Sequence, residues 1–127
     1  MTDGLQPFLS DRVVALSAPT QAWSGPDGDL GSAPIDGVFH GDTRFLREVA
    51  TSYAGADGPF QRPEWVRWSL PSAGQARFDA VLRDVDDSTP DPKVRLERVR
   101  TVTDGRVAET LTVRSHLAEP LAVRLRV

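Results

Sequence analysis

Cysteine is absent from this 127-residue sequence, and histidine occurs only twice. Without cysteine, the chain has no disulfide bond, no thiolate nucleophile and no cysteine-ligated zinc site. The two histidines, His40 and His116, lie far apart and form no His-x-x-x-His pair, so we expect surface or turn positions for them. The sequence therefore predicts no metal site and no cofactor.

Long apolar runs and blocks of like charge are also missing. No stretch approaches the roughly 18 apolar residues of a membrane span, and the amino terminus lacks the basic and apolar regions of a signal peptide. The 15 basic and 18 acidic side chains are interspersed and leave a net charge of −3. We therefore expect a cytoplasmic protein that binds neither membranes nor nucleic acid.

Helical periodicity is missing as well, because no window of about eleven residues sustains an apolar repeat of 3.6. The sequence predicts an all-β fold, an antiparallel β-sandwich or part of one, with long loops rich in Gly, Pro and Asp. Residues 1–127 have the length of a single domain. Since the sequence stops at Val127 within an alternating strand, we expect either a trimmed chain or a domain boundary inside a larger protein.

Strand-like segments of β-branched and alternating apolar residues recur along the whole chain. The clearest pair is separated by Asp104-Gly105, a dipeptide that favours a two-residue type I′ hairpin turn. The expected strands are Arg12–Ser17, Gln21–Trp23, Thr43–Tyr53, Trp65–Leu70, Gln75–Asp84, Val94–Thr103, Arg106–Ser115 and Leu121–Val127.

Clusters of Gly, Pro and Asp predict the connections between these strands. Ser24–Pro34 is expected to be a surface loop, Gly37–Gly41 a turn, and Ala54–Pro63 a further loop. Asp86–Pro92 is polar and contains two prolines, which donate no hydrogen bond to a sheet, so we expect a connection there.

Asp42 and Arg44 are candidate site residues because they are two positions apart and share one face of an extended strand. In one interpretation, Asp42 accepts backbone hydrogen bonds at the end of the turn and Arg44 braces the loop or a neighbouring carboxylate. In the other, the pair lies at a domain interface or at the rim of a sugar-binding cleft, where arginine makes bidentate contacts.

Trp65 and Trp68 are the other candidates for an interface or a cleft rim. Three positions apart on a regular strand, they are expected to face opposite sides, with one inside and the other covering an edge or a partner surface. Together with Trp23 they also allow a second interpretation, a platform that stacks on sugar rings.

No catalytic residue is predicted. Glycoside hydrolysis needs two carboxyl groups about 5 to 10 Å apart, one with a raised pKa. The densest acidic group here, Asp84, Asp86, Asp87 and Asp91, lies in a solvated loop where all of them stay ionised. The sequence also lacks the Gly-x-Ser-x-Gly element of a serine hydrolase.

The segment Gly37–Leu46 reads Gly-Val-Phe-His-Gly-Asp-Thr-Arg-Phe-Leu. It resembles the pattern G-[LV]-F-x-x-D-T-R-[FHY]-L in the N-terminal domain of bacterial amylo-alpha-1,6-glucosidases and glycogen debranching enzymes. The likeness extends over about Val13 to Val127, including the Leu96–Arg100 and Glu109–Val113 segments and Glu119–Val123. Gly41, Arg47 and Ser115 depart from the residues that are usual in that family.

The resemblance implies an antiparallel β-sandwich that precedes an (α/α)6-barrel glucosidase domain, which is absent from this sequence. The catalytic carboxylates of such enzymes lie in the barrel, so the chain is expected to be non-catalytic and to dock on the barrel and shape its cleft. Two alternatives remain open. One is an autonomous carbohydrate-binding module for α-glucan, and the other is a structural domain that forms homodimers through its exposed last strand.

Overall fold

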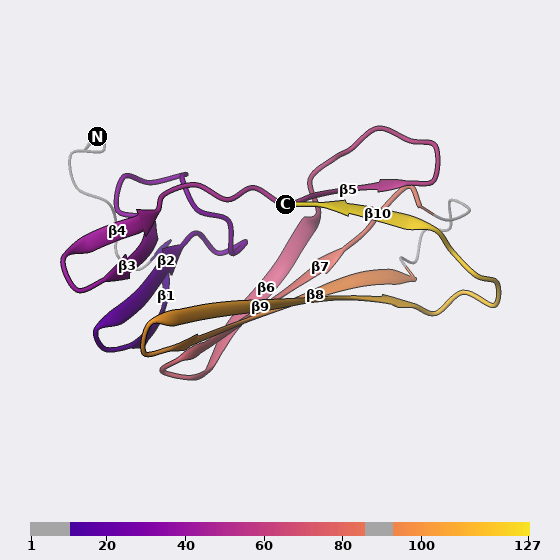
Figure 1. The fold of residues 1–127 in the computed structure, drawn as a ribbon. Coiled ribbons are helices and arrows are strands. Elements are labelled where there is room, and N and C mark those ends of the chain that lie inside the picture. Colours follow the sequence, from indigo (N-terminus) through magenta and orange to yellow (C-terminus); the bar gives the residue numbers. More distant parts are fainter. Residues whose placement is uncertain (1–10, 86–92) are drawn as a thin grey trace.

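A computed structural model describes residues 11–85 and 93–127 (Figure 1). Every strand pairing in it is antiparallel, which confirms the all-β prediction. No helix in these two ranges is long and apolar enough to cross a membrane. The strands are β1 (Val13–Ser17), β2 (Thr20–Ser24), β3 (Gly37–His40), β4 (Thr43–Leu46), β5 (Ser52–Gly55), β6 (Glu64–Ser72), β7 (Gln75–Val81), β8 (Val94–Thr103), β9 (Arg106–Ser115) and β10 (Val123–Arg126).

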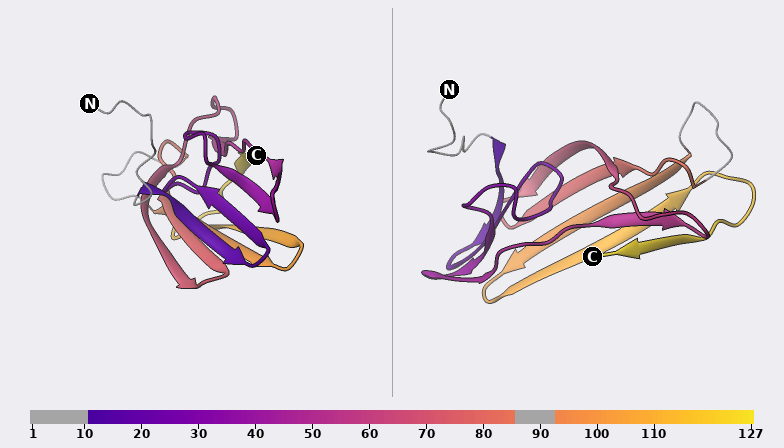
Figure 2. Two further views of the ribbon diagram at one scale, coloured as in Figure 1. Left: turned by 90° about the vertical axis from the view of Figure 1, so that its left-hand side faces the viewer. Right: turned by 90° about the horizontal axis from the view of Figure 1, so that it is seen from above.

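The strands form three sheets. The N-terminal sheet has the order β1-β2-β3-β4, the large sheet has the order β6-β7-β8-β9, and the small sheet pairs β10 with β5. Figures 1 and 2 show the N-terminal sheet and the small sheet over opposite ends of the large sheet. Both pack on the same face of the large sheet, so the fold is a β-sandwich in which one layer is divided in two.

The core is divided in the same way. One apolar cluster joins β1 and β2 to β7 and β8, and its buried members are Val13, Ala15, Ala22, Ala76, Phe78 and Val102. The second joins β5 to the other end of the large sheet through Tyr53, Ala80, Leu82, Val94 and Leu96. On β7 and β8, buried residues alternate with more exposed ones, as expected for strands with one face in the core.

The hairpin of β8 and β9 is confirmed, with Thr103 opposite Arg106 and only Asp104 and Gly105 between them. The predicted turn type is wrong. A type I′ turn needs positive φ at both central residues, whereas only Gly105 has one, at 78°. Positive φ at the second central residue alone is typical of a type II turn, for which glycine is also preferred.

Two boundary predictions around the signature segment are wrong. Gly37–Gly41 is not a turn, because Gly37–His40 forms β3 and the chain reverses at Gly41, where φ is 60°. Thr43–Tyr53 is not one strand either, because β4 ends at Leu46 and β5 starts at Ser52 in another sheet. The intervening residues carry the chain from one sheet to the other.

The segment Ser24–Pro34 is mainly a loop, as its composition predicts, but part of it is buried and does not lie on the surface. Asp29 and Leu30 are buried, and Leu30 forms an isolated bridge with Val49. Asp36, directly after this segment, is buried too and accepts hydrogen bonds from the backbone N–H groups of Gly31 and Ala33. This polar segment can be buried because the carboxylates of Asp29 and Asp36 accept hydrogen bonds from other groups of the protein. The composition of the segment does not show which groups these are.

Two further predicted boundaries differ from the observed ones by two or three residues. The loop predicted for Ala54–Pro63 begins only at Ala56, two residues later than predicted, since Ala54 and Gly55 belong to β5. The strand predicted for Gln75–Asp84 ends at Val81. The predicted connection Asp86–Pro92 lies outside the described residues.

Candidate functional site

Arg44 on β4 holds the preceding loop in place. Its Nη1 donates to the backbone oxygen of Pro34 at 2.8 Å and to that of Asp36 at 3.2 Å. Its guanidinium also lies 5.8 Å from the centre of the Phe39 ring. Arg44 therefore braces the loop, as the structural interpretation of this residue predicted.

Asp42 lies at the exposed turn between β3 and β4. In the described ranges no hydrogen bond reaches its carboxylate, so the predicted role as an acceptor of backbone hydrogen bonds is not seen. Next to it, Phe45 and Leu46 are 70% and 44% exposed. Asp42, Phe45 and Leu46 form what we call the β4 surface. β4 is an edge strand of the N-terminal sheet, and its four residues are all exposed.

A hollow of about 380 Å³ opens beside the β4 surface. Its wall combines strands of the N-terminal sheet with the β8–β9 turn. On that wall, Nδ1 of His40 lies 2.9 Å from the hydroxyl of Thr20, which in turn accepts a hydrogen bond from the backbone N–H of Gly105. The lining residues are Thr20, Val38, His40, Phe45, Gly105, Arg106 and Val107.

Trp65 and Trp68 lie on the same side of β6, so the prediction of opposite sides is wrong. Trp65 is opposite Ala80 and Trp68 is opposite Phe78, two residues of the buried face of β7. A β-bulge at Val66 adds one residue between them and shifts the alternation. The structure brings neither tryptophan together with Asp42 and Arg44 in any contact or hollow of the described residues.

The two tryptophans differ in their surroundings. Trp65 packs against both apolar clusters and meets the Phe78 ring edge to face, with 6.4 Å between the ring centres. Trp68 is 42% exposed. Trp65 therefore contributes mainly to packing, and Trp68 is the one available to a partner or a sugar ring.

Sequence reasoning missed a buried arginine cluster between the two apolar clusters. Arg98 and Arg100 point into the core from β8 and are 0% and 2% exposed. Arg98 Nη1 donates to Asp29 Oδ1 at 2.8 Å, and its Nε donates to Glu109 Oε1 at 2.7 Å. Arg100 Nε donates to the other oxygen of Glu109 at 2.7 Å, and Nη2 donates to the backbone oxygen of Gly28.

Attraction between the opposite charges governs the ionisation of this cluster. Burial acts to lower the pKa of Arg98, but attraction to Glu109 and the hydrogen bond to Asp29 outweigh it and raise that pKa. Burial acts to raise the pKa of Glu109, but Arg100 and Arg98 lower it overall. Burial lowers the pKa of Arg100 from its ordinary value, which still leaves it cationic at neutral pH. The cluster is therefore a set of paired charges, not a proton-transfer site.

The arginine cluster ties the loop between β2 and β3 to the middle of the large sheet. The signal for it was visible in β8, where Val94, Leu96 and Val102 alternate inward with two arginines between them. Buried arginines need carboxylates, and the sequence does not show which of its 18 acidic residues supply them.

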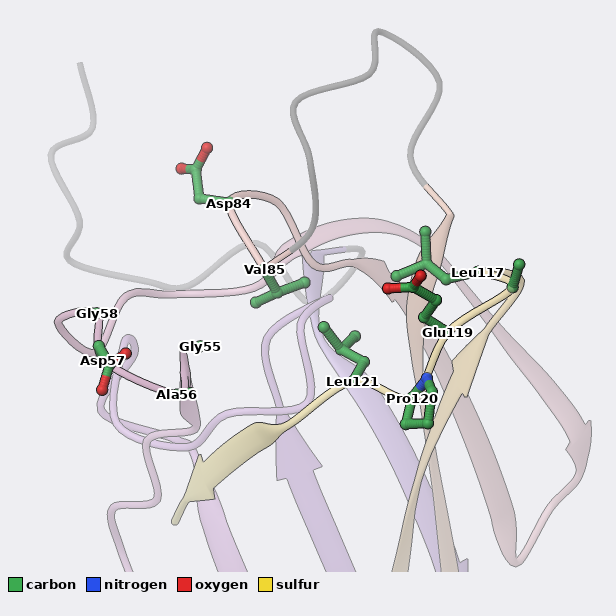
Figure 3. A pocket seen from close by; sticks show the side chains of 11 residues that line it. Gly55, Ala56, Asp57, Gly58, Asp84, Val85, Leu117, Glu119, Pro120 and Leu121 are labelled. Carbon is green, nitrogen blue, oxygen red and sulfur yellow. The ribbon is translucent and has the colours of Figure 1, made fainter.

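A further hollow, of about 610 Å³, lies at the other end of the molecule, beside β5 and β10 (Figure 3). Asp57 and Glu119 lie on opposite sides of it, and Asp84 lies at its rim. Its lining includes no basic side chain. In residues 11–85 and 93–127, no three His, Cys, Asp or Glu side chains gather closely enough to hold a metal ion.

Comparison with protein-family models gives a match, over residues 16–127, to a family described as the N-terminal domain of (some) glycogen debranching enzymes. The matched region begins within β1 and includes every later strand. A search of curated proteins and a search of solved structures found no match to the chain.

Proposed function

Since the chain belongs to the family of N-terminal domains of (some) glycogen debranching enzymes, we propose that it docks on the catalytic glucosidase domain of a parent enzyme and shapes the cleft of that domain. The family's N-terminal domain is a non-catalytic part of a glycoside hydrolase. The (α/α)6 architecture of the partner is an implication of the resemblance.

The observation that carries this proposal is the exposure of the β4 surface. Phe45 at 70% and Leu46 at 44% stand next to each other on an edge strand, beside a hollow lined mainly by apolar surface. Adjacent exposed apolar side chains rimmed by charge are typical of interaction surfaces. Arg44 holds the same strand against the loop, so the surface is preorganised for a partner.

Binding between the purified chain and a separately expressed catalytic domain of a family enzyme tests the proposal. Calorimetry is expected to detect a complex that Phe45→Ser weakens at least tenfold. Leu70→Ser is the matched control, because Leu70 is 45% exposed on β6 in the other layer. No complex, or equal weakening by both variants, contradicts docking through β4, and hydrolysis of an α-1,6-glucoside by the purified chain contradicts a non-catalytic role.

Binding of α-glucan is a second candidate function. The exposure of Trp68 favours it, as does the hollow where Phe45 lies with His40 and Arg106, since sugar sites combine an aromatic face with hydrogen-bonding groups. Titration with maltoheptaose is expected to change tryptophan fluorescence in the native chain and less in Trp68→Phe. A flat response in the native chain rules against this candidate.

Homodimer formation through the last strand is a third candidate. β10 is an edge strand in the small sheet, and its pairing with β5 occupies one of its two edges. An unpaired edge is able to add a strand from a second copy. Sedimentation equilibrium showing a monomer at high concentration rules against it.

A further inference from the structure

The outer face of the large sheet carries a mixed array of charges around a shallow hollow of about 330 Å³. The hollow spans all four strands β6 to β9. Four arginines line it, but only two carboxylates do. Its lining residues are Val66, Arg67, Arg77, Asp79, Ala80, Arg95, Leu96, Glu97 and Arg114. We call this region the arginine face.

The two carboxylates of the arginine face already have partners. Asp79 lies 3.1 Å from Arg67 and 3.4 Å from Arg77, and Glu97 lies 2.8 Å from Arg77. The pairs form a row from β6 across β7 to β8. Arg67 and Arg77 are thereby compensated inside the molecule.

In the part of the chain that the structure describes, Arg95 and Arg114 have no such carboxylate partner. They lie directly opposite each other in the register of β8 and β9, and both are exposed. The ion pairs of residues 11–85 and 93–127 include neither of them. Like charges directly opposite on one face of an antiparallel pair are destabilising. Such a local conflict is expected where a surface is shaped for a partner and not for the free domain.

We propose that the arginine face binds an acidic segment of a partner protein, with one Asp or Glu carboxylate of that segment received between Arg95 and Arg114. Opposite positions in a sheet bring both guanidinium groups within reach of one carboxylate, and arginine matches carboxylates bidentately. The net excess of two arginines in the hollow supplies charge complementarity.

A protein carboxylate suits this face better than a polyanion. Asp79 and Glu97 stand among the arginines and repel a continuous row of phosphates, and the chain as a whole carries a net charge of −3. A single carboxylate placed at the Arg95–Arg114 end stays away from Asp79 and Glu97, and it carries too little charge to be strongly repelled by the net charge of the chain. The arginine face lies on the side of the large sheet away from the N-terminal and small sheets, so it is distinct from the β4 surface.

The first test measures binding of a fluorescein-labelled hexaglutamate peptide by fluorescence anisotropy at low ionic strength. We expect binding that weakens as salt is added, and at least a tenfold loss of affinity in Arg114→Gln. Arg106→Gln is the matched control, because Arg106 is on the same strand and face but opposite Thr103. We expect less than a twofold loss there.

Three results overturn the proposal. The first is no binding of hexaglutamate by the native chain. The second is an equal loss of affinity in Arg106→Gln, which signals dependence on net charge alone. The third is tighter binding of a single-stranded oligonucleotide of the same charge.

The second test separates binding from folding. Since Arg114→Gln removes the repulsion from Arg95, the variant is expected to melt at a higher temperature than the native chain while binding the peptide less tightly. Saturating hexaglutamate is expected to raise the melting temperature of the native chain and not that of the variant. A lower melting temperature for the variant means that Arg114 stabilises the free domain, and it contradicts the proposal.

Discussion

Arg98 Nη1 and Asp29 Oδ1 are 2.8 Å apart although their residues are 69 positions apart in the sequence. The contact joins the loop after β2 to the centre of β8. Arg98 is fully buried and also binds Glu109, so one guanidinium connects three segments of the chain. Several properties of the domain depend on this connection.

Removal of the Asp29 carboxylate is expected to be severely destabilising. Asp29→Ala leaves Arg98 buried without one of its two acidic partners, and breaking a buried ion pair from one side costs about 3 to 5 kcal/mol. Asp29 also accepts the backbone N–H of Thr51 at 3.3 Å, which is lost as well. Denaturation by guanidinium chloride measures the change in the free energy of unfolding.

Asp42→Ala is the control for Asp29→Ala, because Asp42 is an exposed aspartate at a turn. We expect a change within about 0.5 kcal/mol. Similar losses in the two variants would show that the Arg98–Asp29 pair contributes little to stability.

The stability that Glu109 provides is expected to depend on pH. Its pKa is lowered in the folded chain by Arg100 and Arg98, whose attraction exceeds the opposing effect of burial, and an unfolded glutamate has a pKa of about 4.3. The contribution is therefore present above about pH 4.3 and is lost as the pH falls through the lower pKa of the folded state.

The measurement compares the free energies of unfolding of the native chain and Glu109→Gln from pH 3 to pH 7. The native chain should be the more stable near neutral pH, and the difference should shrink at the acidic end. A difference that is constant over this range contradicts the lowered pKa.

Gly37 at the start of β3 is expected to tolerate no side chain. A Cβ there would lie 2.8 Å from the backbone oxygen of Leu46 and 2.5 Å from Arg44 Cδ. We expect Gly37→Ala to cost about 1 to 3 kcal/mol, the range of overpacking substitutions, and to displace Arg44. Gly58→Ala serves as the control, since its Cβ would meet nothing closer than 4.0 Å. Equal melting temperatures for the two variants would contradict the close approach of β3 and β4.

Arg44→Ala is expected to loosen the loop that precedes β3. The variant loses the hydrogen bonds to the backbone oxygens of Pro34 and Asp36, together worth about 1 to 2 kcal/mol. Faster hydrogen exchange at the backbone N–H of Asp36, which donates to Ala33, reports the change locally. Arg47→Ala, a loss of the same charge three residues later, is expected to leave that exchange rate unchanged.

The strands were predictable because their patterns are local. Alternating apolar residues identify β7 and β8 as strands, and Asp104-Gly105 identifies the hairpin turn between β8 and β9, all without knowledge of the surroundings. The β-sandwich class follows from many such segments. The signature segment Gly37–Leu46 is local as well, since its strands β3 and β4 pair with each other, but the prediction of a turn over Gly37–Gly41 missed β3.

The misplaced features depend on contacts between distant residues. Burial of Asp29 requires Arg98, and nothing near Asp29 in the sequence indicates that Arg98 is its partner. The bulge that puts Trp65 and Trp68 on one side is defined by the register with β7. The sequence also does not show that the chain changes sheets between Leu46 and Ser52.

The strand order of the two larger sheets has a kinetic consequence. In the N-terminal sheet and the large sheet, every strand pairs with its neighbour in sequence, so both sheets assemble through short-range hairpins. Pairing of β5 with β10 and the Arg98–Asp29 contact each close a loop of about 70 residues and are entropically costly early in folding. We therefore expect these closures to form after the folding transition state, so that Asp29 variants accelerate unfolding far more than they slow folding.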